Sequence, residues 1–193
     1  MNNQHTTQTL NYYNQNAAQF SNSTQSLDFA SVQDKFLSFL QPQAHILDFG
    51  CGPGRDTKYF LSHGCSTDAI DGSEEFCRIA SEYAGVPVKQ MLFQELNVSE
   101  EYDGIWACSS ILHSTYDELK DILKKLARAL KKEGILYASF KYGDFEGMRN
   151  GRYFIDMTED KLQRILQETD VFQIKEKWIS SDVRPGRYDE KWM

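Results

Sequence analysis

The chain has 193 residues, of which 40% are hydrophobic and 25% charged, and this composition fits one globular domain with a sizeable core. Its formal net charge of -7 disfavours a nucleic-acid-binding protein, because phosphate backbones are bound by clustered Lys and Arg. No apolar run is long enough to span a bilayer, and the polar segment 1–9 does not resemble a secretory signal. We therefore expect a cytoplasmic protein that binds neither nucleic acid nor membrane.

The cysteines are scattered along the chain without a Cys-x-x-Cys pair. This pattern predicts no disulfide framework and no metal site, and it fits a reducing cytosol. The four cysteines are Cys51, Cys65, Cys77 and Cys108.

The N-terminal segment is expected to form a helical cap. Residues 1–26 are polar, with two short stretches of helical spacing, and residues 27–40 have the apolar spacing of an amphipathic helix that ends before Pro42. We accordingly expect one domain, 1–193, with a helical lid or cap at 1–40 and a core at 41–193.

From residue 45 onward, strand-like and helix-like segments alternate. This alternation predicts an α/β protein with a doubly wound, mostly parallel sheet. The last two strands have no helix between them, so we expect an antiparallel hairpin at the sheet edge. The chain stops early in the second of these, and we expect seven strands with the last one short or truncated. Predicted strands cover 45–49, 66–70, 88–92, 104–108, 134–140 and 172–180, and predicted helices cover 56–63, 74–84, 117–131 and 159–169.

Glycines mark the ends of several predicted helices. Gly64, Gly85 and Gly134 each follow a helical segment and suit the left-handed position just beyond a helix. Thr158 precedes the last helix and is a typical N-cap residue.

The most informative motif lies where the first predicted strand ends. Asp48 precedes a turn with glycines at three alternate positions, and the second predicted strand ends at Asp71. Glycines let the backbone turn sharply and approach a ligand, and the next helix points free N–H groups toward it. A strand, glycine turn, helix and second strand that ends in an acid predict half of a nucleotide-binding unit. The three glycines are Gly50, Gly52 and Gly54.

The spacing of this turn argues against a dinucleotide. The dinucleotide fingerprint requires a glycine where this chain has Arg55. Asp48 would also repel a pyrophosphate at close range, so a ligand with a positive group fits better. A dinucleotide-dependent oxidoreductase is therefore the weaker alternative.

Three segments resemble motifs of the class I S-adenosylmethionine-dependent methyltransferases. Residues 47–54 are similar to the first motif of that superfamily, 69–73 to its second and 102–113 to its fourth. The resemblance covers nearly the whole chain from Leu10 onward, and residues 54–56 are similar to small bacterial enzymes of the tellurite-resistance type. It implies a Rossmann-like fold, S-adenosyl-L-methionine as cofactor and S-adenosyl-L-homocysteine as product.

The resemblance also implies a cofactor site at the ends of the first four strands. Asp48 would organise the glycine loop or face the cofactor's ammonium, and Asp71 would accept both ribose hydroxyls. Leu92 and Phe93 would flank adenine. Either Asp alone could instead cap the following helix. The implied cofactor residues are Asp48, Gly50, Cys51, Gly52, Gly54, Arg55, Asp71, Gly72, Ser73, Leu92, Phe93, Ala107 and Cys108.

Catalytic candidates are few, because methyl transfer mainly requires alignment of donor and acceptor and needs a base only if the acceptor must lose a proton. His113 follows the fourth strand and could act as a base or orient the acceptor. Tyr12 could place its ring against the sulfonium. Both residues could instead have purely structural roles.

Basic residues gather in the loops after the fifth predicted strand. On an acidic protein this clustering suggests a small anionic acceptor, although the charges could simply be paired with nearby acids. The candidate substrate residues are Tyr13, Lys141, Arg152 and Tyr153. The leading hypothesis is a methyltransferase acting on a small molecule, and the alternative is a non-catalytic module that binds S-adenosylmethionine. An exposed edge strand can pair with a second copy, so we expect a monomer or a homodimer.

Overall fold

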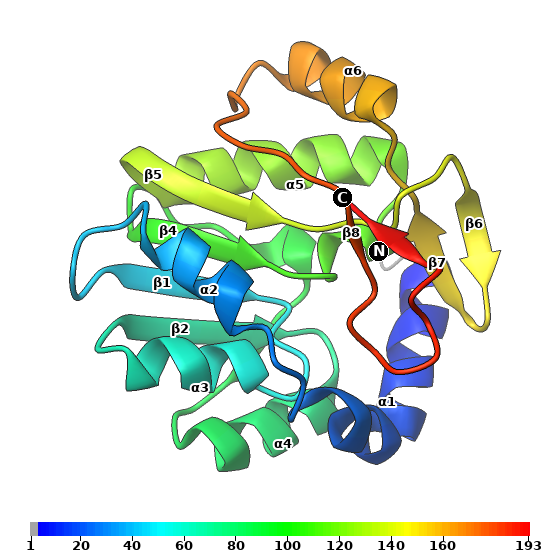
Figure 1. The fold of residues 1–193 in the computed structure, drawn as a ribbon, viewed down its shortest axis with the longest axis horizontal. Coiled ribbons are helices and arrows are strands. Elements are labelled where there is room, and N and C mark those ends of the chain that lie inside the picture. Colours follow the sequence, from blue (N-terminus) through cyan, green and yellow to red (C-terminus); the bar gives the residue numbers. More distant parts are fainter. Residues whose placement is uncertain (1–3) are drawn as a thin grey trace.

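The computed structural model describes residues 4–193. Five parallel strands form a central sheet in the order β3-β2-β1-β4-β5. Helices α5 and α6 lie on one side of this sheet and α2, α3 and α4 on the other (Figure 1). The predicted doubly wound α/β class is therefore confirmed. The strands of the sheet are β1 (His45–Phe49), β2 (Ser66–Asp71), β3 (Lys89–Gln90), β4 (Tyr102–Ala107) and β5 (Leu130–Ala138). The helices are α1 (Gln4–Thr24), α2 (Ala30–Leu37), α3 (Arg55–Ser62), α4 (Glu74–Ala84), α5 (Tyr116–Ala129) and α6 (Glu159–Thr169), with short 3-10 turns η1 (Phe93–Glu95) and η2 (Ile111–His113).

Apolar side chains fill both faces of the central strands. In β1, Leu47 and Phe49 pack in the cluster that includes α5 and α6, whereas Ile46 packs with residues of α2 and α3. Burial on both faces is the normal state of a parallel sheet, and it explains why these strands are continuous apolar runs in the sequence.

A buried carboxylate connects α2, α3 and β4 beneath the sheet. Asp56 accepts hydrogen bonds from Gln33 Nε2 at 2.6 Å, Trp106 Nε1 at 2.9 Å and Arg55 Nε at 2.8 Å. A buried carboxylate is costly unless its oxygens are bonded in this way, so the three donors fix the start of α3 against the sheet.

Local signals located several elements accurately, but they located the end of α5 wrongly. The bounds of β1, α4 and α6 agree with the prediction, and Thr158 caps α6 by accepting a hydrogen bond from the Lys161 amide. Gly134, however, lies inside β5 and does not follow a helix. Helix α5 ends at Ala129, and the left-handed backbone falls on Glu133, with φ at 64°.

The prediction of a seven-stranded sheet is wrong, because the central sheet has five strands. The predicted strand 172–180 is absent except for its last residue, which begins β8 (Ser180–Ser181). Strand β8 pairs with β9 (Lys191–Trp192) in a separate antiparallel sheet. Residues 173–177 are exposed, so this segment lacks the buried face that a sheet strand needs. The predicted hairpin is nevertheless present, and Met193 exchanges two backbone hydrogen bonds with Phe140, at 2.8 and 2.9 Å, beyond the end of β5.

An additional hairpin, which the sequence interpretation treated as a loop, follows β5. Its strands are β6 (Glu146–Arg149) and β7 (Arg152–Ile155), and its turn places Asn150 and Gly151 at positive φ. Two positive φ angles are typical of the tight turns that join twisted strands. The long helix α1 packs against β7 and α4, so hairpin and helix together border the carboxyl edge of the sheet (Figure 1).

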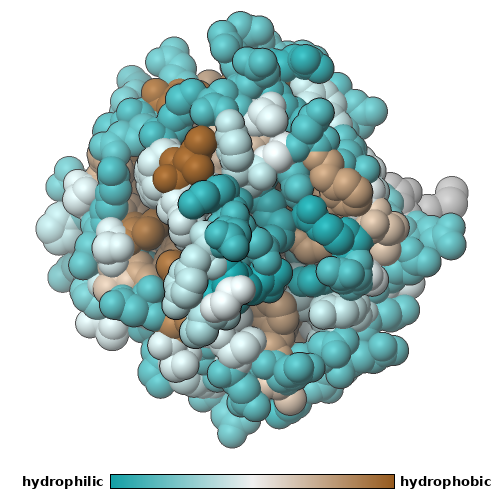
Figure 2. Space-filling model, turned by 45° about the vertical axis from the view of Figure 1, so that its right-hand side comes forward, coloured by the Kyte–Doolittle hydropathy of each residue, from teal (hydrophilic) through white to brown (hydrophobic). Residues whose placement is uncertain are grey.

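The N-terminal cap, predicted for residues 1–40, comprises α1 and α2, and its first three residues lie outside the described residues. The division into cap and core stays a prediction. Between residues 4 and 193, no helix is long and apolar enough to cross a membrane. Hydrophilic residues dominate the face shown in Figure 2, and hydrophobic residues are visible mainly in the recesses between them.

Gly50, in the turn between β1 and α3, is required for two separable reasons, which are backbone conformation and lack of space. An ideal Cβ on Gly50 would lie 2.5 Å from the Ser110 Cβ, and Gly50 also has a φ of +82°. Gly64, with a φ of +81°, has nothing within 4 Å of its Cβ position. We expect Gly64→Ala to lower the free energy of unfolding by about 1 kcal/mol, through backbone strain alone. Gly50→Ala should lower the free energy of unfolding by roughly 1–3 kcal/mol more than Gly64→Ala does, because its added methyl group would also collide with Ser110.

Urea unfolding of the two variants measures this difference. Equal losses of stability in Gly50→Ala and Gly64→Ala would contradict the close approach of Gly50 to Ser110.

Candidate active site

A cavity of about 480 Å³ opens at the carboxyl ends of the central strands. Its walls include the glycine turn after β1, the end of β2, η1, the segment after β4 and α1, and they extend over β5 and parts of α2, α6 and the segment 172–193. Ligands of doubly wound proteins bind at this edge of the sheet, and the volume suits a nucleotide-sized molecule.

The three glycines of the turn have different structural reasons. A Cβ on Gly54 would lie 3.0 Å from Ala80, and Gly50 faces Ser110, so these two glycines permit close packing. Gly52 has a φ of +53°, and nothing lies within 4 Å of its Cβ position. Gly52 lines the cavity, so it is the position where a ligand can approach bare backbone.

Asp71 connects the glycine turn to the end of β2. Its Oδ2 accepts a hydrogen bond from the Gly52 amide at 2.8 Å, and its Oδ1 accepts one from the Ser73 amide at 2.8 Å. Burial raises the pKa of Asp71 to about 6, so the group is mostly ionised at neutral pH. Because Asp71 also lines the cavity, its carboxylate is available to a ligand's donor groups.

Asp48 does not line the cavity. It is 1% exposed and accepts a hydrogen bond of 2.6 Å from the Thr57 hydroxyl. Burial, together with neighbouring Asp56, holds the pKa of Asp48 well above its usual range. The Asp48 carboxyl thus connects the end of β1 to α3, and its predicted role toward a cofactor stays a prediction.

Some of the other predicted cofactor residues line the cavity and some do not. Ser73 caps α4 and donates a 2.6 Å hydrogen bond to Asn14 of α1, so it is occupied outside the cavity. Phe93 lines the cavity and also packs on Phe49, with ring centroids 4.6 Å apart. Those that line the cavity are Gly50, Cys51, Gly52, Arg55, Asp71, Gly72, Leu92, Phe93 and Cys108, and those that do not are Asp48, Gly54, Ser73 and Ala107.

Arg55 borders the cavity with its charge already compensated. Its guanidinium binds Asp56, stacks 4.6 Å from the centre of the Phe29 ring and lies 3.8 Å from the Cys108 sulfur. Because the Arg55 charge is neutralised by Asp56, this side chain stabilises the cavity wall and attracts an anionic ligand only weakly.

Tyr13 and His113, which both line the cavity, form a partly buried pair. The Tyr13 hydroxyl lies 2.7 Å from His113 Nε2, and His113 Nδ1 lies 2.6 Å from the Tyr153 carbonyl oxygen. A carbonyl only accepts, so Nδ1 carries the ring proton and Nε2 accepts the Tyr13 O–H. Burial, with smaller effects of nearby arginines, lowers the pKa of His113 to about 4, and the ring is neutral at pH 7.

Arg152 is the least compensated cation beside this pair. Its Nη1 contacts the Tyr13 oxygen at 3.3 Å, and its guanidinium stacks on Tyr12 at 4.5 Å. Its Nε is buried without a hydrogen-bond partner, and no carboxylate of residues 4–193 pairs with it. The other loop cations have acidic partners, in the pairs Lys141–Glu190, Arg149–Asp156, Arg184–Asp182 and Arg187–Glu190.

Neither Tyr12 nor Tyr153 lines the cavity, so their predicted roles stay predictions without support from its geometry. Tyr12 packs against Gly151 and Arg152 at the hairpin turn. The Tyr153 hydroxyl donates to Glu146 at 3.0 Å on the outer side of the hairpin. Tyr13 instead faces the cavity. Lys141 and Arg152 line it as well.

Sequence interpretation missed several wall residues. Ser109 and Ser110 line the cavity, and Ser109 has a positive φ of 54°. A non-glycine residue with positive φ carries no sequence signal, so only the structure reveals this tight turn after β4.

Comparison with known proteins shows what the chain is similar to. The family model described as "Methyltransferase domain" matches residues 46–134, from β1 into β5, which is a little under half of the chain. Residues 46–134 are therefore similar to a methyltransferase domain. This match covers the glycine turn, Asp71 and the segment after β4 that form the cofactor side of the cavity.

The proteins that this chain resembles are named for different activities or acceptors. A malonyl-[acyl-carrier protein] O-methyltransferase from Enterobacter lignolyticus is 28% identical over 99 residues, which are 48% of this chain and 37% of that protein's length. The Burkholderia thailandensis 1,6-didemethyltoxoflavin-N1-methyltransferase, solved with 1,6-didemethyltoxoflavin and S-adenosylhomocysteine, is 21% identical, with a TM-score of 0.74 over 95% of this chain and 82% of that one. An S-adenosylmethionine-dependent methyltransferase from Clostridium acetobutylicum is 18% identical, with a TM-score of 0.66 over 94% and 96%. At such identities the structures share the fold.

The low pKa of His113 predicts how the stability of the protein depends on pH. In the unfolded chain a histidine takes up a proton near pH 6.5, but in the fold His113 does so only near pH 4. The contribution of the neutral His113 to the free energy of unfolding is therefore complete above pH 6.5. It is lost as the pH falls from 6.5 toward 4, by up to about 1.4 kcal/mol per pH unit.

Urea unfolding between pH 4 and 7 measures this dependence. The slope should be shallower in His113→Asn and unchanged in the control His63→Asn, whose side chain is exposed on the end of α3. Identical slopes in wild type and His113→Asn would rule out the buried neutral ring.

Proposed function

We propose that this protein transfers the methyl group of S-adenosylmethionine to a small anionic acceptor. The observation that carries the proposal is the composition of one cavity. Its cofactor side holds Gly52 and Asp71, and its other side holds Tyr13, His113 and the uncompensated Arg152. The acceptors in the relatives' names differ from one another, so the acceptor class is argued from these side chains.

The cofactor side fits S-adenosylmethionine chemically. The Asp71 carboxylate suits a ribose diol, because it can accept hydrogen bonds from both hydroxyls. Gly52 lets the methionine part approach the backbone, and Leu92 and Phe93 present apolar surface suitable for adenine. The bound cofactor supplies an activated methyl group on a sulfonium.

Tyr13 and His113 suit a role in positioning the acceptor. With a pKa of about 4, His113 has little affinity for a proton at pH 7, so it is a weak base there. The proton on Nδ1 is held by the Tyr153 carbonyl, which fixes the ring and directs the Tyr13 O–H toward Nε2. The Tyr13 oxygen is thus held at the cavity wall in one orientation.

An anionic acceptor is consistent with such a weak base. An acceptor that is already ionised has a free lone pair and needs no deprotonation before in-line displacement of the sulfonium. The Arg152 guanidinium would hold that charge, and its buried Nε is a donor in need of a partner. We expect a small carboxylate, a thiolate or an oxyanion. A monomeric or homodimeric state and a cytoplasmic location stay predictions.

Binding of the cofactor can be tested without knowledge of the acceptor. By isothermal titration, wild type should bind S-adenosylmethionine and S-adenosylhomocysteine, and Asp71→Ala should bind them about 10- to 100-fold more weakly through loss of charge-assisted hydrogen bonds. Affinity should also fall as the pH drops from 7 to 5, because Asp71 takes up a proton near pH 6.

The control is Asp144→Ala, which removes an exposed carboxylate outside the cavity. If folded wild type binds neither compound, the cofactor proposal fails. Unchanged affinity in Asp71→Ala would contradict only the proposal that Asp71 binds the ribose hydroxyls.

The acceptor class can be tested by turnover. Small carboxylates, thiols, oxyanions and neutral analogues are incubated with the protein and S-adenosylmethionine, and formation of S-adenosylhomocysteine is measured. Turnover should be confined to anions, and Arg152→Met should lower it by about tenfold or more, the value of a charge-assisted hydrogen bond. Affinity for S-adenosylhomocysteine should stay unchanged.

Arg78→Met, which removes an exposed arginine of α4, is the control for charge alone. Preference for neutral acceptors, with full activity in Arg152→Met, would refute the anionic class. Tight cofactor binding without turnover of any acceptor would favour the non-catalytic module.

A further inference from the structure

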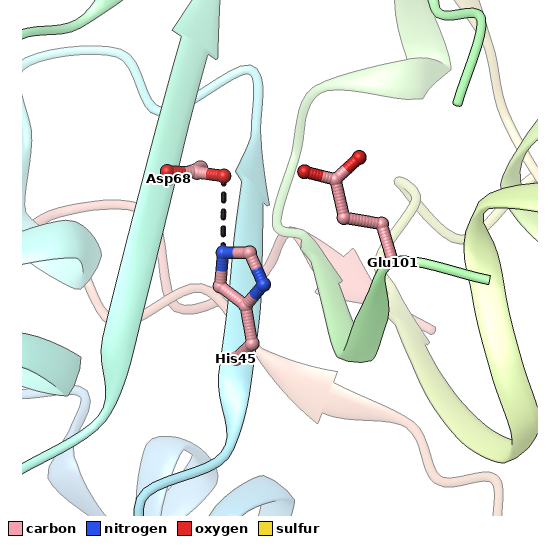
Figure 3. A group of neighbouring side chains, drawn as sticks. All are labelled: His45, Asp68 and Glu101. Carbon is pink, nitrogen blue, oxygen red and sulfur yellow. Dashed lines mark hydrogen bonds and ion pairs between the residues drawn. The ribbon is translucent and has the colours of Figure 1, made fainter. Parts of the chain in front are cut away.

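A second group of polar side chains lies at the opposite edge of the sheet, where the parallel strands begin. His45 starts β1, Asp68 lies in β2, and Glu101 immediately precedes β4. Figure 3 shows the three side chains converging, and their possible ligand atoms all lie within 4.8 Å of one another. None of the three lines the cavity at the carboxyl edge.

The sheet order explains why these residues meet. Strand β1 lies between β2 and β4, with Leu47 opposite Asp68 and Ile46 opposite Gly104. Residues two apart in a strand share a face, so His45 lies on the same side of the sheet as Leu47 and Asp68. The His45 amide also donates to Asp103 at 2.8 Å, which holds the start of β1 beside β4.

The group carries more negative charge than its surroundings compensate. His45 Nε2 lies 3.0 Å from Asp68 Oδ2, and the Tyr102 hydroxyl donates to the same oxygen at 3.2 Å. No Lys or Arg among residues 4–193 forms an ion pair with Asp68 or Glu101. Lys131 is instead bound to Asp103 at 2.8 Å.

The side chain of Glu101 has no hydrogen bond or ion pair in the described part of the chain, although it lies within 4.8 Å of a carboxylate oxygen of Asp68. Two like charges at this distance repel each other. A cation placed between Asp68 and Glu101 would lower this repulsion.

We propose that His45, Asp68 and Glu101 form a surface site for a divalent transition-metal ion such as Zn²⁺. One imidazole nitrogen and two carboxylate oxygens match the mixed nitrogen and oxygen ligands of zinc. The imidazole favours zinc over Mg²⁺ and Ca²⁺, which prefer oxygen ligands alone. Three protein ligands leave a coordination position to water.

This site would act on stability and not on methyl transfer. An ion held there links the beginnings of β1, β2 and β4, so its binding favours the folded state. The reacting groups lie at the other edge of the same sheet. The inference therefore stands or falls independently of the proposed function.

Zinc binding to the untagged full chain tests the site. Isothermal titration with ZnCl₂ should show one saturable site, and thermal unfolding should shift to a higher midpoint with Zn²⁺ but not with MgCl₂. Glu101→Gln, which removes a carboxylate without breaking a contact, should abolish both the binding and the shift. His45→Gln should do the same.

The matched control is His63→Gln, which removes an exposed histidine of the α3 end and should keep both signals. No saturable Zn²⁺ binding by wild type would overturn the proposal. Undiminished binding in Glu101→Gln and His45→Gln would do so as well, and would assign the zinc to other groups such as the cysteines. Binding of S-adenosylhomocysteine, measured on the same samples, reports the cofactor site separately.

Discussion

The cofactor side of the cavity depends on one buried carboxylate with two backbone partners. Asp71 accepts the amide of Gly52 from the turn after β1 and the amide of Ser73 from the start of α4. These bonds hold the ends of two neighbouring strands in one conformation, and each is of the charge-assisted kind that is stronger than a neutral hydrogen bond. Burial disfavours the ionised form of Asp71 and raises its pKa, whereas the hydrogen bonds from the two amides favour the ionised form and lower the pKa.

The two sides of the cavity differ in how they are built. The cofactor side comes from consecutive segments, in which a strand end and the following turn are a few residues apart. The acceptor side comes from distant segments, because Tyr13 belongs to α1, His113 follows β4 and Arg152 lies in β7. The 2.7 Å contact between Tyr13 and His113 attaches α1 to the segment after β4, and the hydrogen bond that the Tyr153 amide donates to the Thr9 hydroxyl attaches α1 to the hairpin. The geometry that orients the acceptor therefore exists only when α1 is docked.

This difference explains how much the sequence could predict. The glycine turn, Asp71, and the bounds of β1 and α4 follow from local spacing, and all were found. Tyr12 was placed in the cavity and Tyr13 beside the substrate, but adjacent positions of a helix point about 100° apart, and packing decides which one faces inward. The Asn150-Gly151 turn had a recognisable hairpin signal that the interpretation did not use. The group of His45, Asp68 and Glu101 had none, because its members come from separate strands.

The structure also changes the reason why the turn disfavours a pyrophosphate. The sequence argument relied on the charge of Asp48, but that carboxyl is buried against Thr57, and burial beside Asp56 disfavours its ionised form. Asp71, in contrast, lines the cavity and is mostly ionised at neutral pH. Asp71 also occupies the Gly52 N–H, one of the donors at the glycine turn that a phosphate would need. A phosphate here would meet a carboxylate and lack that donor, whereas a ribose diol can donate to the same oxygens.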